Sequence, residues 1–450
     1  MTLPPVTDEA NAMAKVFIYA MNYAPEVAGV GHYTGEIGEA FAAKGHAVTV
    51  VTTPPHYPGW NVTAPYRNGR YAVERRAGVR IIRCPLILRQ RMGGIWRLIA
   101  PLSFAVSSAP IALWQILRHR PDVVLCIEPT LMVAPVAVLA ARLIGARTVL
   151  HVQDLEVDAS FAVGHLSRFA GLEALAHGLE RLLLRRFDRL FTISAGMAER
   201  LVAKGVPFEC VTVVRNWVDL DHIKPLESVS PYRGELGMSG SDRIVLYSGN
   251  IGAKQGLNDV IDAARRLAGR AEIKFVIAGE GPAKRELVAR AADLPNVRFL
   301  PFQPYERLSE FLGVADVHVL PQAADVADLA PPSKLDGMLA SGRPIVAAAA
   351  VGTELANFLA GAAILVAPGN PEALAGAIAD AATKPPGGAG SAQRLELARL
   401  LSRVDGLRAA ATATFCSEAC PGREGTAEEL SCAAWLCPCA RRCALGAAAE

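Results

Sequence analysis

Charge of one sign and aromatic side chains are both scarce in this sequence of 450 residues. Its formal net charge at pH 7 is only +3, and aromatic residues make up 6% of it. Because nucleic-acid-binding domains present a strongly basic surface, we expect no nucleic-acid partner. Residues 1–14 lack the basic start and the apolar run of a signal peptide, and we expect them to be a disordered leader.

Cysteine is nearly absent from most of the chain. Only three cysteines occur in the first 415 residues, which is typical of proteins of the reducing cytoplasm, and six more crowd into residues 416–443. These six have no histidine partner and no C-x-x-C pair, so the sequence predicts no metal site. We interpret residues 386–450 as an atypical cysteine-rich tail that has diverged, or lost its reading frame, from about Ser391 onward.

Between these ends, short apolar runs alternate with amphipathic stretches. This alternation is typical of parallel strands separated by helices. The predicted strands of a first series are KVFIYA, AVTVVTT, DVVLCIE, RTVLHV, RLFTIS and CVTVVRN. Those of a second series are RIVLYSG, IKFVIAG, VRFLPF, VHVLP and PIVAAA.

Two such series predict two Rossmann-like domains of the α/β class, each a doubly wound parallel sheet, at residues 15–215 and 243–385. The polar, turn-rich stretch 216–242 separates them and is expected to be a connector. Because ligands bind outside the carboxyl ends of parallel strands, we expect the site in a cleft between the domains.

One segment interrupts the alternation. Residues 98–117 carry no charged side chain, and arginines bracket them on both sides within the stretch 86–120. Their length suffices to cross a membrane, but two prolines and three serines argue against a span. The alternatives are a helix pair buried over the sheet and a helix or hairpin lying on a membrane surface. The basic flanks favour the membrane surface, where arginines contact anionic headgroups.

Glycines follow the predicted strands where a backbone can approach a ligand closely. Those positions, with the asparagine that accompanies one of them, are Gly29, Gly31, Gly249, Asn250, Gly279 and Gly281. Their spacing is not a dinucleotide fingerprint, and the second strand ends without the acidic residue that holds an adenosine ribose, which disfavours a nicotinamide enzyme.

The stretch PPSKLDGMLASGRPIV adds a further candidate turn. Pro332, Ser333 and Lys334 precede a predicted helix, where free amides and a lysine suit an anion such as phosphate. The alternative is that Ser333 is an ordinary N-cap residue. Similarly, Lys254 in YSGNIGAKQGL is placed either to bind a diphosphate or to lie in solvent.

Taken in order, the GVG loop, HVQDLE, GNIGAKQGL, AGEGP and PSKLDGMLASGRPIV resemble the GT-B glycosyltransferases of retaining family four, and among them the colanic-acid type of exopolysaccharide enzyme. The resemblance covers about residues 15–385. It implies transfer of a sugar, with retention, from a nucleotide diphosphate sugar to a lipid-linked oligosaccharide. It also implies a peripheral protein on the cytoplasmic face of a bacterial inner membrane that needs no cofactor.

The resemblance also implies roles for particular residues. Gly29 and Gly31 match the loop near the donor phosphates and the acceptor. His151 matches a histidine placed against the donor sugar, with a core histidine as the alternative, and Asp154 follows it in the same motif. Lys254 matches the lysine that neutralises the diphosphate, and these three polar residues are our catalytic candidates.

Two departures from the family pattern stand out. An arginine common at the start of the second domain's turn is replaced by Asn250. The family's two glutamates fall at Leu329 and Gly337, so Asp328 or the Ser333 turn is the expected substitute. The alternatives to a transferase are a sugar-nucleotide epimerase of the same fold and an inactive scaffold in a polysaccharide assembly complex.

The chemistry that the resemblance implies needs no protein nucleophile and no metal. Lys254, Lys334 and helix-end amides would stabilise the leaving diphosphate electrostatically. The leaving group would itself accept the proton of the acceptor hydroxyl. The single Asp-x-Asp sequence, residues 219–221, is interpreted as a turn in the connector.

Overall fold

A computed structural model describes most of the chain, and it folds into two compact units. The first unit contains residues up to 193, residues 197–214 and the chain from 407; the second contains 194–196 and 215–406. The described residues are 13–26, 29–57, 59–62, 64–89, 96–155, 157–158, 170–252, 255–323, 332–383 and 390–415. The expected leader up to residue 12, Lys254, Asp328 and the cysteines from 416 onward lie outside them.

The first unit has a sheet of eight strands in the order β3-β4-β2-β1-β5-β6-β7-β8. All neighbours are parallel except β3 and β4. The strands are β1 (Lys15–Tyr19), β2 (Ala47–Thr52), β3 (Ala72–Arg76), β4 (Val79–Arg83), β5 (Val123–Glu128), β6 (Arg147–Val152), β7 (Arg189–Thr192) and β8 (Val211–Val213). The helices are α1 (Val30–Ala43), α2 (Trp96–His119), η1 (Leu131–Val133), α3 (Ala134–Ile144), α5 (Ala170–Leu184), α6 (Ala195–Ala203) and η2 (Phe208–Cys210).

The second unit has a sheet of six parallel strands in the order β11-β10-β9-β12-β13-β14. The strands are β9 (Arg243–Ser248), β10 (Ile273–Ala278), β11 (Val297–Leu300), β12 (Val317–Leu320), β13 (Ile345–Ala348) and β14 (Ile364–Val366). The helices are α7 (Pro231–Glu235), α8 (Leu257–Arg266), α9 (Lys284–Arg290), η4 (Tyr305–Arg307), α10 (Leu308–Leu312), α11 (Lys334–Ala340), α12 (Glu354–Phe358), α13 (Pro371–Ala382) and α14 (Ser391–Leu400). The last helix within the described residues is α15 (Arg403–Phe415).

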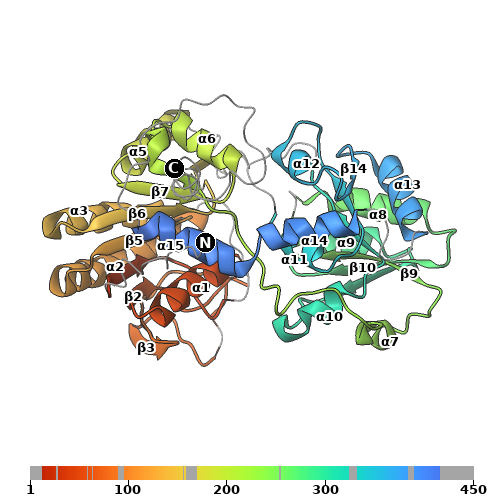
Figure 1. Cartoon of the computed structure of the whole chain (residues 1–450), viewed down its shortest axis with the longest axis horizontal. Coiled ribbons are helices and arrows are strands. Elements are labelled where there is room, and N and C mark those ends of the chain that lie inside the picture. Colours follow the sequence, from red (N-terminus) through yellow and green to blue (C-terminus); the bar gives the residue numbers. More distant parts are fainter. Residues whose placement is uncertain are drawn as a thin grey trace, which may run out of the picture. The chain divides into compact units, whose positions relative to one another are not determined.

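Each unit is thus a parallel sheet covered by helices, as the alternating pattern predicts (Figure 1). Every residue of β5 is buried, because helices lie on both faces of the sheet and the strand VVLCIE has almost no polar side chains. The hairpin of β3 and β4 was not predicted. Its signal is a two-residue turn, Ala77-Gly78, in which both residues have positive φ, between two runs of β-compatible residues.

The expected connector, 216–242, is largely part of the second unit's core. Ile223, Tyr232 and Leu236 are buried in the same cluster as strand residues, and Val218 pairs with Ser402 in an isolated bridge. The apolar residues of this stretch are spaced irregularly among polar ones, so neither a helical nor a strand period shows them in the sequence. Residues 219–221 do form a turn, in which Asp219 Oδ1 accepts from the Asp221 amide at 3.1 Å.

The start of the expected tail is also part of the fold. Leu397 and Leu401 lie in the core of the second unit, and α14 packs on α11. In the first unit, the ring of Phe415 contacts that of Phe41 and stacks on that of His46, with 4.7 Å between the centroids of the stacked rings. Residues 391–415 therefore pack as helices on the two units, and the divergence or frame change expected from about Ser391 stays a prediction.

Residues 96–119 form one helix, α2, and neither Pro101 nor Pro110 ends it. Its inner face is buried against the sheet through Phe104, Ser108 and Ile116, and the Ser108 hydroxyl bonds to the Tyr19 hydroxyl at 2.5 Å. Residues 98–119 are long and apolar enough to span a membrane, but core helices of soluble proteins are often equally long and apolar. The helix is therefore a layer of the first unit.

Candidate functional site

The carboxyl ends of β9 and β10 in the second unit carry the predicted glycine turns. Gly249, Gly279 and Gly281 all have positive φ, a region that favours glycine. A Cβ atom at Gly279 would overlap the carbonyl oxygen of Gly249, and one at Gly281 would overlap that of Ile251. These glycines thus let the two turns pack backbone to backbone, and the Ile251 amide donates to the carbonyl of Glu280 at 2.9 Å.

Lys334 reaches the same place from the start of α11. Its Nζ donates to the Tyr247 hydroxyl at 2.9 Å and lies 4.1 Å from the centroid of that ring. The Tyr247 hydroxyl in turn donates to the carbonyl of Asn250 at 2.6 Å, and a Cβ at Gly249 would lie 3.2 Å from Lys334 Cδ. The structure therefore brings Gly249, Asn250 and Lys334 together, as the sequence predicts.

The electrostatic setting of Lys334 is unusual. Among the described residues no carboxylate pairs with its ammonium group, and burial lowers its pKa to about 7. A lysine with a depressed pKa and no acidic partner gains most from an anionic ligand, which restores the charged form. Tyr247, which sequence reasoning missed, orients this lysine; a tyrosine at a strand end carries no distinctive signal.

The other two residues of the turn before α11, Pro332 and Ser333, make fewer contacts than Lys334. Ser333 is the N-cap residue of α11, but its side chain is exposed and makes no capping hydrogen bond, and Pro332 is half-buried. Gly337, where the family pattern places a glutamate, lies against Leu312. The neighbouring Asp336 is buried and its Oδ2 has no hydrogen-bond partner among the described residues, so burial holds its pKa well above the usual range.

In the first unit the predicted glycine loop is organised around a buried carboxylate. Glu26 Oε1 accepts from the amides of His56 and Tyr57, each at 3.0 Å, and Oε2 accepts from Asn22 Nδ2 at 2.9 Å. Gly31 lies inside α1 and not before it, and a Cβ atom there would overlap the Glu26 carboxylate. Gly31 is therefore required by internal packing, and it is buried.

Two further glycines of α1 extend this packing. Gly35 lies against Ala24 and Gly38 against Tyr23, so the chain after β1 runs closely along one face of the helix. Gly29, the residue before α1, has a φ of 65° and lies under the Tyr57 ring. The glycine spacing in GVGHYTGEIG follows this helical face, which explains why it matches no dinucleotide fingerprint.

Arg83, at the end of β4, is fully buried and fixes the loops after β1 and β2. Its guanidinium donates to the carbonyls of Ala24 at 2.7 Å and Thr53 at 2.8 Å, and to Glu74 Oε1 from Nε at 2.8 Å. Because the guanidinium is planar, its N–H groups point in fixed directions, and here they match three acceptors at fixed positions. Glu26 and Arg83 together hold the carboxyl edge around β1 and β2, and no motif in the sequence marked either residue.

His151 lies in the core of the first unit, at 1% exposure. Its ring stacks on Phe191 with centroids 4.1 Å apart, and neither ring nitrogen has a hydrogen-bond partner among the described residues. Burial lowers its pKa to about 3, so the imidazole is neutral at physiological pH. This position agrees with the core alternative that the sequence left open.

With this geometry in place, comparison with known proteins decides the family. The model of the glycosyl transferase 4-like domain matches residues 28–217, and that of the glycosyl transferases group 1 matches residues 242–384. The putative colanic acid biosynthesis glycosyl transferase WcaI of Escherichia coli K12 is 40% identical over 381 residues, which cover 82% of this chain and 93% of WcaI. The chain belongs to the GT-B glycosyltransferases.

Solved structures agree on the fold. Sucrose-phosphate synthase from Thermosynechococcus elongatus has a TM-score of 0.67 at 17% identity and covers 89% of this chain and 98% of its own. Anabaena HepE in complex with UDP and glucose has a TM-score of 0.63 at 17% identity, and the match covers 88% of this chain and 98% of the HepE chain. The predicted GT-B fold and glycosyltransferase class are therefore confirmed.

The remaining catalytic candidates of this glycosyltransferase are placed less fully. Asp154 lies in the loop just after β6, with an exposed side chain. Lys254 and Asp328 lie outside the described residues, so the contacts expected of them stay predictions.

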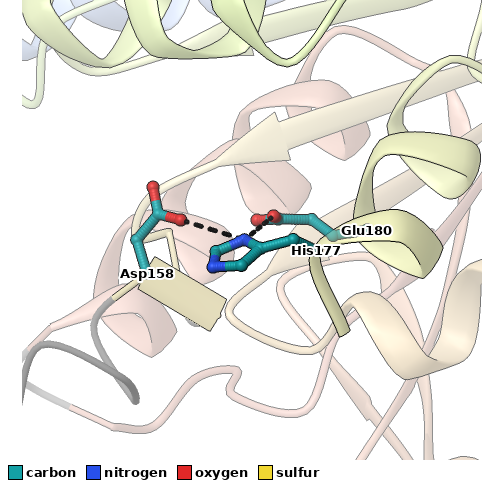
Figure 2. Close-up of side chains that lie close together, drawn as sticks. All are labelled: Asp158, His177 and Glu180. Carbon is teal, nitrogen blue, oxygen red and sulfur yellow. Dashed lines mark hydrogen bonds and ion pairs between the residues drawn. The ribbon is translucent and has the colours of Figure 1, made fainter. Parts of the chain in front are cut away.

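A second charged cluster in the glycosyltransferase joins Asp158, His177 and Glu180 (Figure 2). His177 Nδ1 lies 3.6 Å from Asp158 Oδ1 and 3.3 Å from Glu180 Oε2. The three residues have the types that bind a metal, but Lys204 Nζ donates to Asp158 at 2.7 Å and to Glu180 at 2.5 Å. Since the Lys204 ammonium already pairs with both carboxylates, and Arg200 Nη1 lies 3.8 Å from Asp158 Oδ2, the cluster is an ion-pair network that ties residue 158 to α5 and to the chain after α6.

A hollow of about 860 Å³ lies at the other edge of the first sheet. Asp122, Arg147 and Arg189, at the amino ends of β5, β6 and β7, line it together with Phe415. Ligands of parallel sheets bind at the opposite, carboxyl edge, so this hollow is not the glycosyltransferase's candidate site.

Proposed function

We propose that the enzyme transfers a sugar, with retention, from a nucleotide diphosphate sugar to a lipid-linked oligosaccharide in exopolysaccharide synthesis. The observation that carries the donor half of the proposal is Lys334. Its ammonium has no acidic partner among the described residues and lies beside the glycine turn at the end of β9. A diphosphate would supply the missing negative charge.

Several facts support a nucleotide donor. The HepE structures that this fold resembles contain UDP, UDP with glucose, or UDP-glucose. Parallel α/β sheets bind such ligands beyond the carboxyl ends of their strands, where the turns after β9 and β10 lie. The buried Asp336, two residues after Lys334, has an oxygen available for a hydroxyl group of the donor.

The proposed chemistry is electrostatic. The bond between the sugar's anomeric carbon and the diphosphate oxygen breaks, the acceptor oxygen bonds to that carbon on the same face, and the acceptor proton passes to the diphosphate. Lys334, together with Lys254, stabilises the charge that develops on the leaving group. His151, as a neutral imidazole, has no role as a charged acid in this scheme, and no metal or other cofactor takes part.

The acceptor half rests on kinship with an enzyme whose name assigns it to colanic acid biosynthesis. The resemblance of the sequence implies a lipid-linked oligosaccharide as the acceptor, so we place the enzyme on the cytoplasmic face of the inner membrane, as a peripheral protein. The lipid-linked acceptor brings the reaction to the bilayer surface.

Calorimetric titration with UDP and with GDP tests the donor site. We expect one of the two nucleotides to bind, and Lys334→Met to weaken its binding by about a hundredfold, because a charge-assisted hydrogen bond is lost. Lys224→Met, which removes an exposed lysine of the same unit, is the matched control and should bind like the parent.

Two outcomes would contradict the proposal. If neither nucleotide binds to a folded protein, the inactive scaffold becomes the better description. If a nucleotide binds and a radiolabelled nucleotide sugar is converted into its epimer but not transferred to membrane lipid extract, the enzyme is an epimerase.

A further inference from the structure

Three helices of the first unit cover the same face of its sheet. The chain passes from β4 through α2 to β5, from β5 through α3 to β6, and from β6 through α5 to β7, always in the same direction along the sheet. Because crossovers between parallel strands are right-handed, α2, α3 and α5 lie on one face. Helices α2 and α3 also pack directly against each other (Figure 1).

The outer surface of this layer is apolar. Large apolar side chains project from it into solvent, and Val106 and Leu139 are 68% and 60% exposed. Those of α2 and α3, which we name the apolar face, are Leu102, Val106, Leu113, Trp114, Leu117, Leu139 and Leu143. A similar row on α5 is Leu175, Leu179 and Leu182, at helical spacing. Scattered exposed leucines are ordinary, but rows on adjacent helices are not.

The charges around the apolar face have one sign. Neither α2 nor α3 contains an aspartate or glutamate, whereas Arg118, His119 and Arg142 are exposed at their ends. On α5, Arg181 is exposed and Glu180 is buried in its bond to Lys204. A surface for another copy of this chain would need complementary acidic groups, which α2 and α3 lack.

We propose that the apolar face of α2 and α3, extended by α5, docks onto the anionic surface of a lipid bilayer. Apolar side chains enter the boundary between headgroups and acyl chains, Trp114 lies at the interface, and the arginines contact anionic headgroups. The inner face of α2 stays packed on the sheet, so the helix lies along the membrane and does not cross it. The inference rests on the proposed function only in that a lipid-linked acceptor gives the docking a purpose.

Flotation of the full chain with lipid vesicles tests this. The protein should bind vesicles that contain equal parts of phosphatidylglycerol and phosphatidylcholine, and bind pure phosphatidylcholine weakly. The double variant Val106→Asp, Leu139→Asp should lower partitioning into the anionic vesicles about tenfold or more, because each aspartate removes an apolar contact and is repelled by the surface. Val229→Asp, at a 74% exposed valine of the second unit, is the matched control and should bind normally.

A second variant tests the charges separately from the apolar contacts. Arg118→Gln with Arg142→Gln should reduce binding to the anionic vesicles about fivefold per arginine and leave the weak binding to pure phosphatidylcholine unchanged. Melting curves from circular dichroism show that each variant is folded.

The proposal is overturned if the folded parent protein ignores both kinds of vesicle, or if the double aspartate variant floats as well as the parent. Sedimentation that shows a dimer for the parent and a monomer for the double variant, without vesicle binding, would assign the face to a second copy. Nucleotide calorimetry on the same samples separates the two proposals: normal nucleotide binding without flotation refutes only the docking, and flotation without nucleotide binding refutes only the donor site.

Discussion

Each unit has a glycine in the stretch that follows its first predicted strand, and the two glycines serve different purposes. In the first, Gly31 makes room for the carboxylate of Glu26, which is already satisfied by backbone amides and Asn22. In the second, Gly249 lies beside Lys334, whose ammonium has only a phenol as partner among the described residues. A glycine after a strand therefore marks close approach, and the neighbouring charge shows whether the approaching group is part of the protein or a ligand.

The largest effect that this contrast predicts is on stability, at Gly31. Gly31→Ala should lower the free energy of unfolding by about 3 kcal/mol, because the new methyl group overlaps the Glu26 carboxylate and the helix cannot move away from its sheet. Urea unfolding measures this loss. Gly249→Ala is the comparison variant: strain at its φ of 148° should also cost some stability, but it should in addition weaken nucleotide binding, and normal nucleotide affinity there would break the contrast.

Glu26→Gln should have the next largest effect. The amide keeps the shape but loses the charge that strengthens two bonds from backbone amides, so unfolding should become easier by about 2 kcal/mol. If the network positions a working loop, kcat should fall while the nucleotide's affinity for the second unit stays constant. Glu36→Gln, on the same stretch of chain, is the control; a Glu26→Gln enzyme with full kcat would make the network purely structural.

The third prediction concerns pH at Lys334. The free enzyme holds the pKa of this lysine at about 7, and a bound diphosphate raises it, so binding takes up a proton. Above pH 7, nucleotide affinity should therefore fall by up to about tenfold per pH unit, until the pKa of the complex is reached. Calorimetry at pH 6.5 and 8.5 checks this, and Lys334→Arg, which stays charged, should flatten the profile.

The prediction with the smallest expected effect concerns the pH dependence of stability that one buried histidine in each unit produces. Burial lowers the pKa of His151 and of His318 to about 3, whereas the unfolded chain protonates near 6.5. Between those values the unfolded state binds more protons, so stability is retained above pH 6.5 and decreases as the pH falls, by up to about 1.4 kcal/mol per unit for each group. His151→Phe should reduce this slope in urea titrations at pH 7 and 5; an unchanged slope would show that the pKa of His151 is not lowered in the folded protein.

The success of sequence reasoning varied with the range of the interactions involved. Strands such as VVLCIE were predictable because burial on both faces demands a continuous apolar run. Tyr232 and Leu236 were missed as core residues because they lie in a turn-rich stretch without a period. Arg83 and Glu26 were missed because their partners are loop carbonyls and amides contributed by other strands, which no local pattern records.

The sequence by itself determined the alternating strands and helices and the motifs that mark the glycosyltransferase family, because each depends on neighbours along the chain. Only the tertiary structure decided that Gly31 belongs to internal packing, that Lys204 fills the cluster of Figure 2, and that α2 is buried on one side and apolar on the other. Those three outcomes depend on which distant segments meet, and close packing settles that only when the whole core is assembled.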